Sequence, residues 1–164
     1  MDLPELPTNI RAATPEDVPA IGRMIRELAE FEREPDAVKT TPEQLHEALF
    51  GADAVASALI ALDGSGEPAG FALWYRTFST WEGVPGLFLE DLYIAERERG
   101  SGLGRALLTA LARIVVKNGW KRLEWNVLRW NSEAIAFYDT LGGRPLDDWL
   151  TYRLSGAALE SLGA

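Results

Sequence analysis

The feature that most constrains the fold is a glycine-rich turn at residues 99–105, with the sequence Arg-Gly-Ser-Gly-Leu-Gly-Arg. It follows an apolar run over 87–94 and precedes an amphipathic run from Gly102 to Asn118. Glycines permit positive φ angles and let a ligand approach the backbone closely. Successive N–H groups at a helix N-terminus, which carries partial positive charge, form a cradle for a diphosphate. The turn therefore predicts an anion site between a strand and a helix.

Two common nucleotide-binding motifs compete for this turn. The phosphate-loop motif requires Lys and then Ser or Thr after its last glycine, whereas Arg105 and Ala106 follow Gly104. The dinucleotide fingerprint requires its third glycine one residue later, although Glu124 falls about 20 residues on, where that fold holds a ribose-binding acid. We reject the first motif and keep the second as a runner-up. Glycines that merely punctuate a loop are the remaining interpretation of the turn taken alone.

The rest of the chain predicts alternating helices and strands. Thr14 and Thr41 are each followed by proline and an acid, which is typical of a helix start, and the two helices end before Pro35 and at Gly51. Two apolar runs separated by the turn cluster 63–68 predict a hairpin. In chain order we expect strands at 9–12, 54–62, 69–78, 87–94, 122–128 and 149–154, with the third and fourth helices from Gly102 and over 132–141.

This order predicts an α/β (α+β) fold with a mixed, mostly antiparallel central sheet flanked by helices. At 164 residues the chain suits a single hydrophobic core, so we expect one domain over residues 1–164. No apolar run approaches the roughly 20 residues that cross a bilayer, and the acidic start has no signal-peptide pattern. We therefore expect a cytoplasmic protein without a membrane partner.

Composition narrows the chemistry. The net charge of −9 disfavours nucleic acid and would suit a cationic substrate, although an acidic surface also serves solubility. Cysteine is absent and His46 is the only histidine, which excludes disulfides, thiol catalysis and histidine-rich metal clusters. We assign His46 to a helix surface. Catalysis would run on carboxylates, phenols and backbone groups, and we expect no metal.

The motif Arg99-x-x-Gly102-x-Gly104 is accompanied by further matching segments on both sides. These are Leu89-Glu90-Asp91-Leu92-Tyr93-Ile94, Trp130-Asn131, Ala134-Ile135, Phe137-Tyr138, Leu141-Gly142 and the closing segment Trp149 to Leu154. Together they resemble the GNAT superfamily of N-acetyltransferases, and within it the diamine (spermidine/spermine) and thialysine acetyltransferase branch. The resemblance runs from about Ile10 to Leu154, and it implies acetyl-coenzyme A as the cosubstrate and a homodimer as the assembly.

The resemblance also implies residue roles. Backbone groups of Leu92, Tyr93 and Ile94 would pair with the pantetheine arm like an added strand, and Asn131 would meet its far end. Glu32 and Glu90 would be placed toward the amine. Asp91 is assigned to the substrate as well, with a purely structural role as the open alternative. The pyrophosphate would be bound by the turn, namely Arg99, Gly100, Ser101, Gly102, Leu103, Gly104 and Arg105.

Catalysis is assigned to Glu90 and Tyr138. Alkylamines are mostly protonated at neutral pH, so a carboxylate such as Glu90 can attract the ammonium and accept its proton, directly or through water. A backbone N–H of residues 92–94 can stabilise the developing oxyanion, and the Tyr138 phenol can protonate the departing thiolate. Tyr138 could instead be a packing residue, and Asn131 could cap the following helix. Strand alternation predicts that Glu90 and Asp91 point to opposite faces.

The favoured activity is N-acetylation of a primary amine of a small molecule, of the diamine, polyamine or lysine-analogue class. Two alternatives stay open, a protein or peptide N-acetyltransferase and a non-catalytic coenzyme A-binding module. The sequence leaves the individual amine undetermined, because the acceptor pocket depends on the first helices.

Overall fold

A computed structural model describes all 164 residues, which fall into two compact units, residues 1–126 and 127–164. The prediction of a single domain over 1–164 stays a prediction. The first unit contains β1 (Ile10–Ala12), α1 (Val18–Phe31), α2 (Pro42–Phe50), β2 (Ser57–Leu62), β3 (Pro68–Ser79), β4 (Val84–Ile94), α3 (Leu103–Lys117) and β5 (Leu123–Trp125). The second contains α4 (Ser132–Asp139) and α5 (Gly156–Gly163).

Local sequence signals set several helix boundaries. The Thr41 hydroxyl accepts a hydrogen bond from the Gln44 N–H at 3.2 Å, while the Gln44 side chain accepts one from the Thr41 N–H at 3.0 Å. This reciprocal pair satisfies two N–H groups that have no acceptor inside the helix. After Thr14 the chain first makes a 3₁₀ turn over Pro15–Asp17, so α1 begins at Val18.

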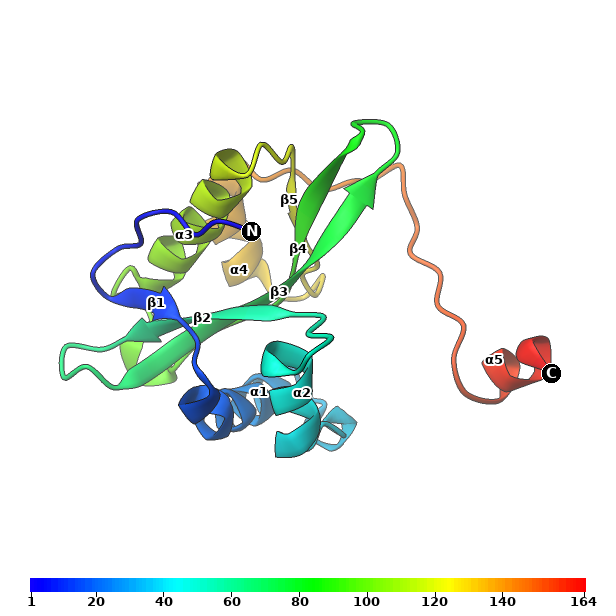
Figure 1. Cartoon of the computed structure of the whole chain (residues 1–164), viewed down its shortest axis with the longest axis horizontal. Coiled ribbons are helices and arrows are strands. Elements are labelled where there is room, and N and C mark those ends of the chain that lie inside the picture. The colour runs from blue at the N-terminus through cyan, green and yellow to red at the C-terminus, as the bar shows by residue number, and fades with distance from the viewer. The chain divides into compact units, whose positions relative to one another are not determined.

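The five strands form one sheet in the order β1-β2-β3-β4-β5. The pairs β1–β2, β2–β3 and β3–β4 are antiparallel. The pair β4–β5 is parallel, and α3 connects these two strands. Helices α1 and α2 cover one face of the sheet and α3 covers the other (Figure 1). The expected mixed, mostly antiparallel sheet flanked by helices is confirmed.

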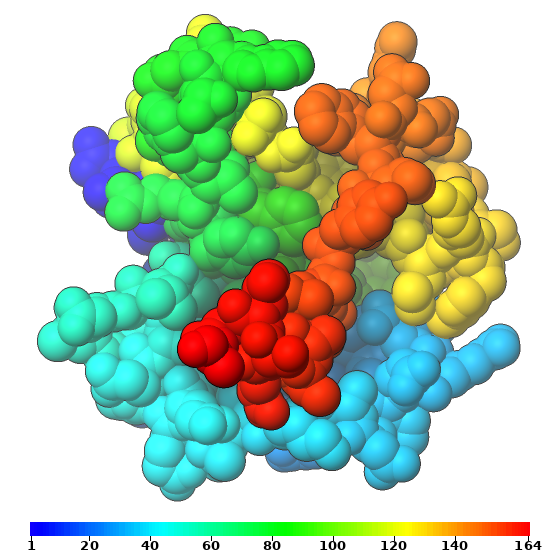
Figure 2. All heavy atoms as spheres, turned by 90° about the vertical axis from the view of Figure 1, so that its right-hand side faces the viewer, coloured from blue at the N-terminus to red at the C-terminus, as the bar shows by residue number.

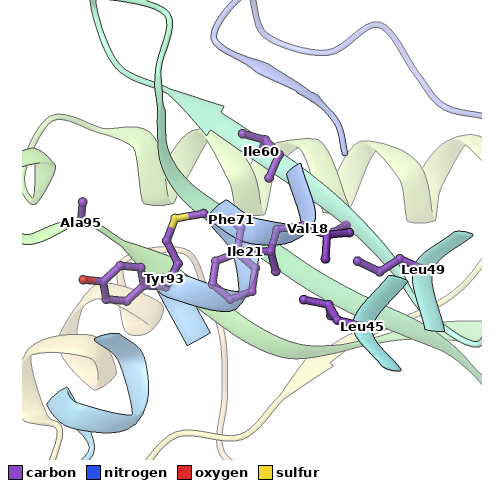
Figure 3. Close-up of a cluster of buried hydrophobic side chains, with 10 residues drawn as sticks. Val18, Ile21, Leu45, Leu49, Ile60, Phe71, Tyr93 and Ala95 are labelled. Carbon is purple, nitrogen blue, oxygen red and sulfur yellow. The ribbon is translucent and has the colours of Figure 1, made fainter. Parts of the chain in front are cut away.

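Apolar side chains are buried on both faces of this sheet. On the α1–α2 face, Ile21 and Met24 pack with Ile60 and Phe71, and Tyr93 lies at one end of the cluster with its hydroxyl pointing away from the aliphatic groups (Figure 3). On the α3 face, the fully buried residues include Leu107, Leu111 and Ile114. Each large side chain buried in this way contributes about 1.5–3 kcal/mol to folding. The packing on both faces therefore holds the strands of the sheet in place, together with the polar side chains that they carry.

The β3–β4 hairpin extends beyond its neighbours. Residues 77–79 of β3 pair only with residues 84–86 of β4, and the tip of this hairpin projects from the sheet (Figures 1 and 2). Two large apolar side chains near the tip are exposed, Phe78 by 64% and Trp81 by 87%. An exposed aromatic pair at the end of a projecting ribbon is a common feature of association surfaces.

Two sequence predictions at the C-terminal end are wrong. No strand forms over 149–154, where Trp149, Leu150 and Tyr152 are exposed, because a strand persists only with a neighbour to satisfy its backbone groups. The strand expected over 122–128 is confined to β5, and the helix α5 was not predicted. None of the helices is long and apolar enough to cross a membrane.

Candidate active site

The glycine-rich turn lies between β4 and α3, as predicted. Gly100 and Gly102 have φ angles of 81° and 93°, in the region that side chains with a Cβ rarely adopt. Gly102 caps α3 without a side-chain hydrogen bond, and the first intrahelical bond runs from Ala106 N–H to the Gly102 carbonyl at 3.0 Å. The first-turn amides therefore lack acceptors within the helix and point out of its positive end. This turn has the geometry to hold a diphosphate.

The strand before the turn offers a second backbone feature. Pairing between β4 and β5 covers only Leu87–Leu89 opposite Leu123–Trp125. Within the first unit, residues 90–94 of β4 therefore have no partner on the β5 side. An extended ligand arm can add to such an edge as if it were another strand. Leu92, Tyr93 and Ile94, predicted to bind the pantetheine arm, belong to this part of β4.

A β-bulge at Glu90 corrects one prediction. Leu89 pairs with Trp74 and Asp91 pairs with Leu73, so Glu90 is the extra residue on β4. A bulge places two residues opposite one and interrupts the alternation of side chains. Because Leu73 and Trp74 face opposite sides, Asp91 lies on the α1–α2 face although Leu89, two residues earlier, lies on the α3 face.

Glu90 is an electrostatic neighbour of residues on this face. The Glu90 carboxylate raises the pKa of Asp91 and also that of Tyr75. The bulge therefore removes the regular alternation from which opposite faces were predicted for Glu90 and Asp91. Glu32, which caps the end of α1, also raises the pKa of Asp91.

Glu32 completes an acidic cluster with these two residues. It is the C-cap of α1, and burial raises its pKa. Burial is also the main cause that raises the pKa of Asp91, to about 6, followed by the charges of Glu90 and Glu32. Three carboxylates from two elements are thus electrostatic neighbours, and a cation would relieve their mutual repulsion. The sequence assigned Glu32 and Glu90 to the amine and left Asp91 open between substrate contact and a structural role.

Tyr75 is a further neighbour of this cluster, and no sequence pattern indicated it. Tyr75 on β3 pairs with Phe88 on β4, and their rings stack with centroids 5.3 Å apart and planes at 29°. Burial, followed by the charge of Glu90, raises the pKa of the Tyr75 phenol. The cluster is therefore bordered by an aromatic pair. The sequence of β3 contains no signal for this contact, because the register between β3 and β4, shifted by the bulge, decides which residues meet.

Asn131 and Tyr138 belong to the second unit. The Asn131 side chain accepts a hydrogen bond from the Ala134 N–H at 3.1 Å, so it caps α4, as one of the two interpretations of its role predicted. Tyr138 lies in the last turn of α4, half-buried, with its ring centroid 5.5 Å from that of Phe137. Their roles toward the cosubstrate stay predictions. Arg105 is exposed at the start of α3, and His46 is exposed on α2, as expected.

Comparisons with known proteins agree with this geometry. The profile of the acetyltransferase (GNAT) family matches residues 22–142. The thialysine N-epsilon-acetyltransferase of Caenorhabditis elegans is 41% identical over 154 residues, covering 92% of this chain and 94% of that protein. The enzyme of the same name from Sus scrofa is 37% identical over 163 residues, covering 93% and 95%. L-ornithine N5-acetyltransferase NATA1 of Arabidopsis thaliana is 30% identical, covering 94% and 87%.

Solved structures share the fold. An integron cassette protein from the mobile metagenome of V. cholerae superposes with a TM-score of 0.78 at 23% identity, covering 94% of this chain and 96% of that one. The family profile spans the glycine-rich turn, the bulged strand and α4. The chain therefore belongs to the acetyltransferase (GNAT) family and is an acyltransferase.

Proposed function

We propose that this enzyme transfers the acetyl group of acetyl-coenzyme A to a primary amine of a small molecule, of the diamine, polyamine or lysine-analogue class. The observation that carries the proposal is the electrostatic proximity of Glu32, Glu90 and Asp91, the last two on the strand that leads into the glycine-rich turn. Relatives named for thialysine and ornithine, which are amino acids with a side-chain amine, support the same class.

The residues fit the cosubstrate. Positive φ angles at Gly100 and Gly102, with open space where a Cβ would lie, leave room for a diphosphate against the backbone. The unpaired edge of β4 at residues 90–94 suits a pantetheine arm with alternating amide groups. Arg99, Ser101, Leu103, Gly104 and Arg105 complete the proposed binding turn, and a role of Asn131 toward the cosubstrate stays a prediction. Acetyl-coenzyme A supplies the activated acyl group.

Two proton transfers are needed, one from the substrate ammonium and one to the leaving thiolate, and different side chains perform them. The acidic cluster draws in the substrate ammonium, and a carboxylate takes its proton so that the nitrogen becomes nucleophilic. Glu90 is the base that the sequence favours, and the pKa of about 6 adds Asp91 as a second candidate, because a base works best with a pKa near the operating pH. A β4 N–H stabilises the oxyanion, and the Tyr138 phenol returns a proton to the leaving thiolate.

Release of free thiol tests the proposal directly. The enzyme is incubated with acetyl-coenzyme A and a panel of diamines, polyamines, ornithine and lysine analogues, with neutral amino acids as controls. We expect turnover among the diamines, polyamines, ornithine and lysine analogues and none with the neutral amino acids. If no amine on the panel is acetylated, the proposal is refuted. Tyr138→Phe is expected to lower kcat about a hundredfold if the phenol is the acid. A rate near that of the wild type would remove Tyr138 from the mechanism.

Acetylation of proteins or peptides is the alternative activity. It requires access for a polypeptide, whereas three carboxylates beside an aromatic pair suit a short cationic chain. Mass spectrometry of lysates treated with the enzyme would reveal acetylated proteins if the alternative holds. A non-catalytic coenzyme A-binding module predicts tight binding of acetyl-coenzyme A with no turnover of any amine.

We further propose a cytoplasmic homodimer that needs no metal, membrane or nucleic acid. The exposed aromatic side chains at the hairpin tip, Phe78 and Trp81, support an association surface. Light scattering after gel filtration is expected to give twice the 18.1 kDa chain mass. Replacing both tip residues by Ser is expected to shift the mass toward the monomer, and a wild-type monomer at micromolar concentration would refute the dimer.

A further inference from the structure

The side chain of Arg99, the first residue of the glycine-rich turn, contacts the acceptor side of the molecule. Its Nε donates a hydrogen bond to the Ile94 carbonyl at 3.4 Å. Its guanidinium carbon lies 4.8 Å from the centroid of the Phe31 ring, a cation–π contact. A side chain from the turn is thus in contact with the last residue of α1.

The end of α1 depends on contacts of this kind. Glu32, a member of the acidic cluster, directly follows Phe31 as the helix C-cap. The next residue, Arg33, has a φ of 65°, and it is the one non-glycine residue of the chain with a positive φ. Helices usually place glycine at this position, because other residues pay a steric cost in the left-handed region. The direction of the Glu32 carboxylate is therefore set at a strained helix end.

A second contact connects Arg99 with the same helix. Tyr93 on β4 is 7% exposed, and its hydroxyl interacts with both Glu27 and Arg99. Burial, followed by the hydrogen bond and charge of Glu27, raises the pKa of Tyr93, and Arg99 acts in the opposite direction. Glu27 and Phe31 are four residues apart and lie on the same side of α1. Arg99 thus bridges β4 and the final turn of the helix.

We infer that Arg99 is a positioning residue that couples the cosubstrate turn to the acceptor site, by holding the end of α1 so that Glu32 faces the amine. The inference rests on the proposed function, because it assigns the turn to acetyl-coenzyme A and Glu32 to the amine. A bound diphosphate would order the backbone of the turn and with it the Cα of Arg99. Because the Arg99 guanidinium contacts Phe31, the ordered turn would also hold Phe31 and the adjacent Glu32 in place. Binding of the cosubstrate would therefore strengthen binding of the amine.

The variant Arg99→Met tests this coupling, because it keeps an apolar side chain on Phe31 and removes the guanidinium. At saturating acetyl-coenzyme A, the KM for the amine is expected to rise about tenfold, the size of a lost cation–π and hydrogen-bond contact, in addition to any change in the Kd for acetyl-coenzyme A. Arg99→Lys is expected to restore part of the amine KM. A weakened cosubstrate affinity with an unchanged amine KM would overturn the inference.

Matched variants separate the two sites. Phe31→Leu is expected to raise the amine KM as Arg99→Met does, and the double variant is expected to raise it no further, because both changes remove one contact. Arg105→Gln, at the other end of the turn, is expected to weaken the binding of acetyl-coenzyme A. At saturating acetyl-coenzyme A it is expected to leave the amine KM unchanged. Additive effects of Arg99→Met and Phe31→Leu would refute a shared contact.

Hydrogen exchange gives a measurement that does not depend on turnover. In the wild type, acetyl-coenzyme A is expected to slow amide exchange over residues 28–34. In Arg99→Met, exchange there is expected to be faster and insensitive to the cosubstrate. If no amine is acetylated but exchange responds in this way, the proposed function fails and the coupling stands. If exchange over 28–34 is the same in both proteins, the coupling fails.

Discussion

Asp17 and Asp91 are two buried or half-buried aspartates on the same side of the sheet, and their surroundings are opposite. Asp17 is 5% exposed and accepts hydrogen bonds from both terminal nitrogens of Arg11, at 2.6 and 2.8 Å, and from the Thr14 N–H at 2.8 Å. The Arg11 guanidinium lowers the pKa of Asp17 more than any other cause. Asp91 has two carboxylates as neighbours, and its pKa is raised to about 6.

This difference shows that burial alone does not mark a functional acid. Asp17 is fully satisfied and joins β1 to the start of α1, so its charge serves folding. Asp91 is ionised against burial and against like charges, so its charge weakens the fold until a cation arrives. The partners of each carboxylate, rather than its accessibility, separate the structural aspartate from the one suited to a site.

The largest effect is expected from Asp17→Asn. The substitution leaves the Arg11 guanidinium opposite an amide, and removing one member of a buried ion pair costs about 3 kcal/mol. Urea unfolding at pH 7.5 would measure the loss. The amine KM of the folded fraction should stay unchanged, and a stability equal to that of the wild type would break the comparison.

The substitution Asp91→Asn is expected to act in the opposite direction on stability. At pH 7.5 the neutral amide removes a penalty of about 1–3 kcal/mol, the free-energy equivalent of a carboxyl pKa raised from 3.8 to about 6. The same change is expected to lower kcat/KM for the amine about thirtyfold. Unfolding curves and steady-state kinetics on one preparation would check both, and a destabilised but active variant would contradict the assignment.

The pH dependence of stability sharpens the contrast. A raised carboxyl pKa adds a penalty that is fully present above about 6 and disappears as the pH falls toward the unfolded value of 3.8. The stability gained by Asp91→Asn over the wild type should therefore shrink between pH 6.5 and 4. The lowered pKa of Asp17 works in reverse, since its contribution is lost only as the pH falls below 3.8. If the difference in free energy of unfolding between Asp91→Asn and the wild type stays constant from pH 6.5 to pH 4, the raised pKa of Asp91 is refuted.

The smallest expected change is a shift in the ionisation of Asp91 on Glu32→Gln. Removing this like charge lowers the pKa of Asp91, and the shift is small because Glu32 is the third of its three causes after burial and Glu90. The midpoint of the acidic limb of kcat/KM against pH should move down by a fraction of a pH unit. An upward movement would place the Glu32 carboxylate elsewhere.

Local signals made much of the fold predictable. The capping box at Thr41, the hairpin cluster 63–68 and the apolar face of α3 each depend on neighbours in the sequence, and each was placed correctly. The strand predicted over 149–154 depended on a distant partner that no local pattern specifies, and it does not form. Long-range pairing is where sequence reasoning stops.

The site was predictable in its members and not in its geometry. Glu32 and Glu90 were named from resemblance, Asp91 was left between substrate contact and structure, and strand alternation predicted opposite faces for Glu90 and Asp91. A single extra residue in β4 interrupts that alternation, and nothing in the sequence of β4 marks where the extra residue lies. The Arg11–Asp17 pair was missed for a similar reason, because it depends on where β1 ends relative to α1.

The position of Glu90 outside the ladder register has a consequence for how this enzyme can diversify. A residue without a cross-strand partner belongs to no ladder pair, so no directly opposite side chain has to fit it. Side chains of other size or charge can replace it at little cost to folding. Preference among amines can therefore drift in descendants of this gene while the scaffold beneath stays the same.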